Sequence, residues 1–275
     1  MIPDHAARCA AFKALHDRRE TFVIPNPFDA GSARALAASG FKALATTSAG
    51  VAFTLGRRDG MVGREEALAN ARAIIEATEL PVSADLENCY GHEPEVVAET
   101  IRLAFETGLA GGSVEDASGN ERDPIYPREH AVARVQAAVE ATRQLPHPFM
   151  LTARAEGFLH GQGDLGEIIA RLQAFEAAGA DVVYAPGLPD LDAVRAVVQA
   201  VKCPVNVLMP GRNPFTLQQL AEIGVVRISV GALLSRVALG AVMRAAAEMQ
   251  EGGTFGWVEQ APLTRDINAI MEGPR

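Results

Sequence analysis

Short runs of apolar residues alternate along the chain with longer stretches in which apolar residues recur every three or four positions. The longer stretches, such as 93–108 and 164–179, have the spacing of amphipathic helices, and the short runs have the length of buried strands. Strands that alternate with helices indicate βα units and a parallel sheet. Eight short runs can be counted, at 21–26, 41–48, 81–87, 110–116, 149–156, 180–187, 204–210 and 225–231.

Glycine and proline punctuate these runs in a regular way. The even-numbered runs follow a helical stretch that ends in glycine, and the odd-numbered runs from the third onward are entered through proline. The residues are Gly40, Gly108, Gly179 and Gly224, and Pro81, Pro148 and Pro204. This alternation predicts a (βα)₂ unit repeated four times, and hence an α/β fold that closes into a (β/α)₈ TIM barrel. An open, doubly wound sheet is the alternative.

Two segments lie outside the eight units. Residues 4–19 read as an N-terminal helix that could plug the bottom of the barrel, and residues 253–275 read as a C-terminal helical extension. We therefore expect a catalytic barrel domain over 1–252. The extension contains a short amphipathic piece, LTRDINAIME, which could pack on its own barrel or reach a neighbouring subunit.

Composition narrows the class of protein. With 48% hydrophobic and 21% charged residues the 275-residue chain is globular, and no apolar run has the roughly 18 residues that a membrane span needs. The formal net charge of −9 disfavours nucleic acid and acidic lipid as partners, although a local arginine could still bind a small anion. Cys9, Cys89 and Cys203 form no CxxC pair, and the first residues lack the apolar stretch of a signal peptide, so we expect a cytoplasmic protein.

Acidic residues gather where the third, fourth and fifth strands should end, which is the active-site face of a barrel. Asp85 and Glu87 are two residues apart, so on one strand they would face the same side and converge with Glu115. Crowded carboxylates repel unless a cation lies among them, and oxygen ligands without His or Cys favour Mg²⁺ or Mn²⁺ over zinc. Asp116 is better interpreted as the N-cap of the next helix.

The positions of arginine and lysine favour binding of a 2-oxo acid over Schiff-base chemistry at these strand ends. Arg154 lies in an apolar strand, where it must pair with Glu156, with another carboxylate at the mouth or with a ligand carboxylate. A cation and an arginine together would hold a 2-oxo acid. Schiff-base chemistry needs an amine at the mouth, whereas Lys42 and Lys202 lie at strand entrances and Lys13 in the first helix. The stretch SVGALL (229–234) could bind phosphate or could be a plain strand-to-helix turn.

Four motifs, in the order TTSAGVAFTLGRRDG, SADLENCYG, GGSVEDASG and LTARAEGFLHG, resemble the isocitrate lyase and phosphoenolpyruvate mutase superfamily over about residues 20–250. The resemblance implies that Asp85, Glu87 and Glu115 hold Mg²⁺ directly or through water, with Asp59 in the same network. It also implies that Thr47, Ser48 and Ala49 offer N–H and hydroxyl groups to a substrate carboxylate and that Arg154 binds the ligand. We add Asn206 as a substrate-binding candidate and Tyr184 as a catalytic candidate, since both fall at strand ends. Arg154 and Asp59 are the other two catalytic candidates.

Two of the places at which the sequence departs from the superfamily pattern bear on the proton donor. Lyases of the superfamily carry a cysteine on a loop after the fourth strand, but the loop at 117–130 has neither cysteine nor lysine. In the mutase branch a histidine follows the sixth strand, where this chain has Pro186. The proton donor is therefore open among Tyr126, His130, Tyr184, Cys89 and His160, each of which could instead be structural, with packing the safer interpretation for Cys89.

From these features we expect a Mg²⁺-dependent lyase or decarboxylase that acts on a small 2-oxo or 2-hydroxy mono- or dicarboxylate through an enolate. Phosphoenolpyruvate mutase-like or phosphonopyruvate hydrolase-like P–C bond chemistry is one alternative. A 2-oxo-acid-binding protein with little turnover is another. The resemblance also implies a homo-oligomer, a dimer or tetramer, in which the C-terminal helix swaps between neighbours.

Overall fold

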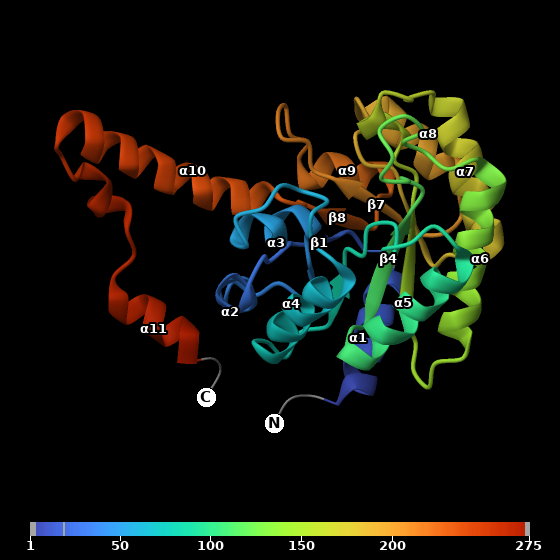
Figure 1. The fold of residues 1–275 in the computed structure, drawn as a ribbon, viewed down its shortest axis with the longest axis horizontal. Helices are drawn as coiled ribbons and strands as arrows, with labels where there is room; N and C mark the ends of the chain where they lie inside the picture. Colours follow the sequence, from blue (N-terminus) through green and yellow to red (C-terminus); the bar gives the residue numbers. More distant parts are fainter. Residues whose placement is uncertain (1–3, 19, 273–275) are drawn as a thin grey trace.

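Eight parallel strands form a nearly closed barrel, as the computed structural model of residues 4–18 and 20–272 shows (Figure 1). Neighbours follow the order β1-β8-β7-β6-β5-β4-β3-β2. Between β1 and β2 the Ala45 N–H donates to the Pro25 carbonyl over 3.1 Å. The sequential order and the pairing of β1 with β8 confirm the predicted TIM barrel and exclude the doubly wound sheet. The strands are β1 Phe22–Ile24, β2 Leu44–Ala45, β3 Val82–Ala84, β4 Gly111–Glu115, β5 Met150–Arg154, β6 Val182–Tyr184, β7 Val205–Leu208 and β8 Arg227–Ser229.

Helices surround the barrel, with one before the first strand and others after each strand or its loop (Figure 1). Their bounds are α1 His5–Asp17, α2 Ala30–Ala38, α3 Ser48–Thr54, α4 Arg64–Glu76, α5 Pro94–Thr107, α6 Arg128–Arg143, α7 Leu165–Ala178, α8 Leu191–Ala200, α9 Leu217–Ile223, α10 Leu233–Ala247 and α11 Thr264–Glu272. Short 3₁₀ turns span Gly157–His160 and Gly256–Gln260, and a π-helical turn spans Glu248–Gly252. Gly108, Gly179 and Gly224 end their helices in the left-handed conformation, as the punctuation predicted.

The N-terminal helix closes the bottom of the barrel. Asp4 caps α1 through its side chain, and Cys9 and Phe12 on its inner face are fully buried. They pack in one apolar cluster with Ile24, Ala43, Ala110, Met150 and Val182, which lie in or beside strands β1, β2, β4, β5 and β6. The predicted plug is therefore confirmed.

His16 on α1 lies under the barrel, where burial and the nearby Arg227 lower its pKa to about 3. Because the unfolded chain binds the proton with a pKa near 6.5, acid favours unfolding over a window from about pH 6.5 down to 3. We expect stability to fall there by up to about 1.4 kcal/mol per pH unit through this one proton. His16→Gln should flatten the pH dependence of the urea midpoint, whereas the exposed His160→Gln should not. If the urea midpoint changed equally with pH in the wild type and both variants, the lowered pKa of His16 would be contradicted.

The C-terminal part leaves the barrel. Helix α10 projects away from the strands, and the chain then turns back so that α11 lies against α2 (Figure 1). The Arg34 side chain donates to the Met271 carbonyl at this contact. Along α10 only Ser235 is buried, and several large apolar side chains are exposed, namely Val237, Leu239, Val242 and Met243. No helix within the described ranges is both long and apolar enough to cross a membrane.

Candidate active site

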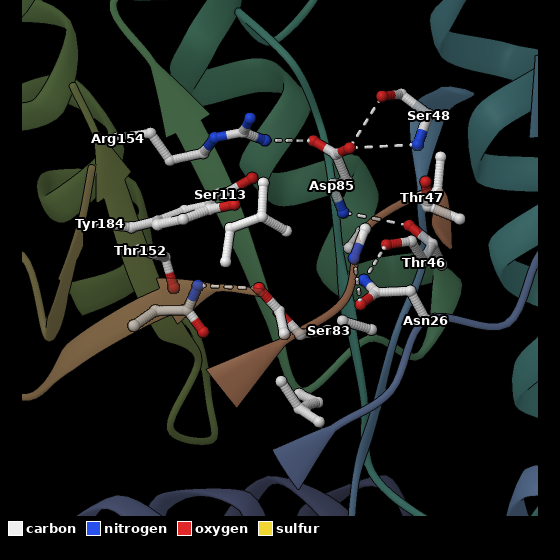
Figure 2. A pocket seen from close by; sticks show the side chains of 18 of the residues that line it. Asn26, Thr46, Thr47, Ser48, Ser83, Asp85, Ser113, Thr152, Arg154 and Tyr184 are labelled. Carbon is white, nitrogen blue, oxygen red and sulfur yellow. Dashed lines mark hydrogen bonds and ion pairs between the residues drawn. The ribbon is translucent and has the colours of Figure 1, made fainter. Parts of the chain in front are cut away.

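A cavity of about 220 Å³ opens at the carboxyl ends of the strands, where the sequence predicted the site (Figure 2). It brings together most of the predicted residues, since the lining includes Thr47, Ser48, Ala49, Asp59, Asp85, Arg154, Tyr184 and Asn206. Glu115 lies beside the cavity and pairs with Arg154, and the Glu87 N–H donates to Asp85 Oδ1 at 3.4 Å. None of the three lysines lines the cavity, so the lining offers no side-chain amine for Schiff-base chemistry.

Arg154, at the end of β5, is the centre of charge at this mouth. Its guanidinium forms ion pairs with Asp85 at 2.6 Å, with Glu115 at 3.3 Å and with Glu156 at 2.8 Å. It also lies 5.1 Å from the ring centroid of Tyr184. Burial alone would lower the arginine pKa, but the three carboxylates raise it well above its usual value. The structure thus shows the carboxylate pairing that an arginine in an apolar strand requires, and Arg154 is a cation at any physiological pH.

Asp85 follows β3 and is held from two sides. Ser48 donates to Oδ2 through its backbone N–H at 3.0 Å and its hydroxyl at 2.7 Å, while Arg154 donates to Oδ1 (Figure 2). The backbone N–H of Asp85 donates to the Thr46 hydroxyl. Burial opposes ionisation, but Arg154 and the Ser48 donors outweigh it, so the pKa of Asp85 lies below its usual value. The Ser48 donors, predicted to face a substrate carboxylate, are bonded to Asp85 here.

Glu87 reaches the site by a different route from the one predicted. Strand β3 ends at Ala84, and Glu87 has a φ of +49° in a turn in which Cys89 and Tyr90 are also left-handed. The argument from strand alternation was therefore wrong, although Glu87 still lies close enough to Asp85 and Asp59 for their charges to act on it. The turn places the Glu87 carbonyl 3.1 Å from the Glu115 N–H. Arg134 holds this turn, since its guanidinium donates to the carbonyls of Asn88, Gly91 and His92.

The acids around Asp85 are crowded enough to suit a cation. Burial, Asp85 and Asp59 raise the pKa of Glu87 to about 7, and burial raises that of Glu115 well above its usual value. Glu87 Oε1 is buried without a hydrogen-bond partner within the described part of the chain. In the same part no three acidic, imidazole or thiolate groups lie close enough to share one ion directly. The donor set therefore fits an ion held by one carboxylate, with water between it and the others.

Asp116 has a different role from the predicted N-cap. Helix α6 begins at Arg128 with Pro127 as its cap, after a loop, so Asp116 is too far from the helix to cap it. Its buried carboxylate instead accepts the Glu156 N–H at 2.7 Å and pairs with Arg171 at 3.1 Å. Burial raises the pKa of Asp116 to about 6 despite these donors. Because Asp116 holds the Glu156 backbone, it positions the Glu156 carboxylate, which accepts from Nε of Arg154.

Tyr184 and Asn206 form the side of the cavity opposite Asp85. Asn206 Nδ2 donates to the Ser229 hydroxyl at 2.9 Å, and Tyr184 lies near the same hydroxyl. Our sequence interpretation missed the polar residues beneath them. Ser113, Thr152 and Arg227 line the cavity two residues before Glu115, Arg154 and Ser229 on the same strands. A polar residue at every second position of these apolar runs was the available signal.

Of the candidate proton donors, Tyr184 lies in the cavity lining and the others do not. The Tyr126 hydroxyl lies 2.6 Å from His92 Nδ1, and His130 contacts the His92 carbonyl. Cys89 is fully buried, and burial raises the pKa of its thiol to about 12, consistent with packing. His160 is exposed.

The chain is similar to known proteins over most of its length. The family model described as phosphoenolpyruvate phosphomutase matches residues 12–250. A solved structure from Burkholderia cenocepacia J2315, described only as a lyase/mutase, is 53% identical, with a TM-score of 0.96 over 98% of this chain and 97% of that one. Oxaloacetate acetylhydrolase, solved with its product oxalate, is 26% identical, with a TM-score of 0.86 over 97% and 94%.

A curated relative extends the comparison to lyases. The 2-methylisocitrate lyase of Escherichia coli is 29% identical over 221 residues, which is 76% of this chain and 73% of that protein. The predicted superfamily, and with it the prediction of an enzyme of that superfamily, is confirmed. With the family model matching most of the barrel, the chain belongs to the phosphoenolpyruvate phosphomutase family, within the phosphoenolpyruvate mutase and isocitrate lyase superfamily.

Proposed function

We propose that the protein is a Mg²⁺-dependent lyase or decarboxylase that breaks a C–C bond of a small 2-oxo or 2-hydroxy acid through an enolate. The observation that carries the proposal is the pairing of Asp85 with Arg154 in one cavity, with Glu115 paired to the same arginine and Glu87 next to Asp85. It is supported by the relatives, which include a 2-methylisocitrate lyase and an oxaloacetate decarboxylase.

Asp85 would hold the cation directly, and Glu87, Glu115 and Asp59 would hold it through water. Bound there, Mg²⁺ or Mn²⁺ would supply Lewis-acid stabilisation of the enolate oxygen. The orphaned Oε1 of Glu87 supports this assignment, because a buried acceptor without a partner is costly. The raised pKa values of Glu87 and Glu115 support it too, because a nearby cation would lower both pKa values and keep the two side chains ionised.

Arg154 would bind the substrate carboxylate, together with N–H groups at the start of α3, which Thr47 caps. In a 2-oxo acid with a carboxylate on C3, that carboxylate leaves as CO₂, and the electron pair of the broken C–C bond passes into the 2-carbonyl to give an enolate, which then takes a proton at C3. In a 2-hydroxy acid the hydroxyl loses its proton and becomes the carbonyl of a 2-oxo acid, while the electron pair of the broken C–C bond passes to the departing fragment as the enolate of its carboxylate, which then takes a proton at carbon. The fixed Arg154 guanidinium stabilises the charge that develops next to the carboxylate. Tyr184, between Arg154 and Ser229, is our candidate for moving that proton.

Four of the five candidate proton donors lie outside the cavity, and this favours a second candidate function. Because Tyr126, His130, Cys89 and His160 lie away from the cavity, a 2-oxo-acid-binding protein with little turnover is the alternative. The two are separated by incubating the protein and Mg²⁺ with oxaloacetate, 2-methylisocitrate and phosphonopyruvate and following products by NMR. We expect product from a C–C substrate. Product from phosphonopyruvate alone would indicate P–C chemistry, and binding without any product would indicate the binding protein.

We further propose that the chain forms a homo-oligomer, a dimer or tetramer, in which α10 and residues 253–275 contact a neighbouring subunit. The exposed apolar side chains of α10 and of the segment after it support this, since Val242, Met243 and Phe255 are each more than 60% exposed. Light scattering should give a mass that is a multiple of 29.1 kDa, and Val242→Glu should reduce it to one subunit. A monomeric wild type would contradict the proposal.

A further inference from the structure

The interior of the barrel is polar below the mouth. Barrels of this type are usually filled there by layers of bulky branched residues. In this chain Ser83 on β3, Ser113 on β4 and Thr152 on β5 line the same cavity two residues before Asp85, Glu115 and Arg154, and so lie one layer lower in the barrel. Figure 2 shows Ser83 and Thr152 below the Arg154–Asp85 pair. The cavity therefore continues from the mouth into the barrel.

Arg227, at the start of β8, lines the same cavity with only 5% of its surface exposed. Strand register places it beside Asn206, whose Oδ1 accepts from its Nε at 2.8 Å. Nη2 donates to the Thr152 hydroxyl at 2.8 Å, and Nη1 lies 3.4 Å from Nε2 of His16. All three partners are neutral, since the lowered pKa of His16 keeps it uncharged.

The guanidinium of Arg227 is thus a buried charge without a counter-charge. No carboxylate lies within ion-pair distance of it in the part of the chain that the structure describes, in contrast to Arg154, which has three. An arginine has five N–H donors, and only three find acceptors here. A buried charge of this kind is costly unless an anion compensates it.

Ser113 provides a second, independent observation. Its hydroxyl is buried, lines the cavity and has no hydrogen-bond partner among residues 4–18 and 20–272. It lies beside Thr152 in the register of β4 and β5, and Thr152 is bonded to Arg227. A buried hydroxyl without a partner indicates a missing ligand or water. A cation and a free hydroxyl therefore face the same space from neighbouring positions.

We propose that Arg227, Thr152 and Ser113 form an anion subsite, the floor subsite, that binds a second carboxylate of the substrate. This inference rests on the proposed function and deepens it. The substrate is a dicarboxylate, with its reacting 2-oxo or 2-hydroxy end at Asp85 and Arg154 and its other carboxylate at Arg227. Free N–H groups of a guanidinium suit a carboxylate, and the two hydroxyls can each donate a further hydrogen bond.

The test compares two ligands by calorimetry on the full chain with Mg²⁺. Oxalate is too short to reach the floor subsite from the mouth, whereas 3,3-difluorooxaloacetate carries a second carboxylate beyond its 2-oxo group. We expect Arg227→Met to lower the affinity for 3,3-difluorooxaloacetate by roughly 50-fold, which is the loss expected when a hydrogen bond to a charged group is removed. The same variant should change the affinity for oxalate by less than about twofold. An equal loss for both ligands, or for neither, would overturn the floor subsite.

Ser113→Ala tests the same subsite with little risk to folding, because it removes a hydroxyl that bonds to nothing in the described structure. We expect it to leave the melting temperature and the affinity for oxalate unchanged and to lower the affinity for 3,3-difluorooxaloacetate by about fivefold. An unchanged dicarboxylate affinity would show that the hydroxyl holds only water. If the wild type binds neither ligand, the proposed function fails; if it binds oxalate but not the dicarboxylate, only the floor subsite fails.

Discussion

Replacing Arg154 with methionine should destabilise the protein by about 3–5 kcal/mol at pH 8 and lower turnover by roughly 10³-fold. The variant leaves Asp85, Glu115 and Glu156 close together without their shared cation. Without Arg154 the pKa values of Asp85 and Glu115 rise in the folded state, so the unfolded chain releases protons first and stability falls as the pH rises above about 4.3. The loss should accordingly be smaller at pH 5 than at pH 8.

Urea unfolding at the two pH values measures this effect. Arg195→Met is the matched control, because Arg195 forms an ion pair with Asp192 in which both side chains are largely exposed. Exposed pairs contribute at most about 1 kcal/mol, so this control should differ little from the wild type. A stability loss in Arg154→Met that is the same at both pH values would contradict the charge account of the site.

Replacing Asp85 with asparagine should abolish metal-dependent turnover, with a loss of roughly 10³-fold, and weaken Mg²⁺ binding by at least about 100-fold. The side chain keeps its shape and can still accept from Ser48, so the loss reports the charge and not the fold. Stabilisation by Mg²⁺ in thermal unfolding gives a readout that does not depend on activity, because a ligand of the folded state raises the melting temperature.

Asp181→Asn provides the control for Asp85. It makes the same chemical change at the other end of the barrel, where Asp181 accepts the Leu151 N–H at 2.8 Å. This variant should keep both Mg²⁺ binding and turnover. Unchanged turnover in Asp85→Asn, or an equal loss in the two variants, would remove Asp85 from the proposed metal site.

Much of the fold was predictable because local signals agreed with the global topology. Helix-ending glycines such as Gly108 and Gly179 adopt the left-handed conformation that the punctuation implied, and the strands they precede pair in sequential order. Parallel strands bring their carboxyl ends to one face, which is why Asp85, Arg154 and Tyr184 could be placed together from sequence.

The parts that sequence did not predict depend on backbone geometry and on loop length. Left-handed residues other than glycine are uncommon, so nothing in the sequence indicated that Glu87 reaches the site through a turn. Asp116 was misassigned because a cap requires the helix to begin next to it, whereas α6 begins only at Arg128. Arg227 lies inside an apolar run, and only its position two residues before Ser229 marks it as facing the cavity.

The central claim is that a cation and Arg154 together bind the enolate of a 2-oxo acid at the strand ends. Oxalate resembles the enolate of pyruvate in its planar arrangement of oxygens and its charge, so its titration into the protein by calorimetry tests the claim directly. The account predicts oxalate binding with Mg²⁺ present and a loss of at least about 100-fold in affinity after the metal is removed with a chelator. Equal affinity with and without Mg²⁺, or no binding in either case, would contradict it.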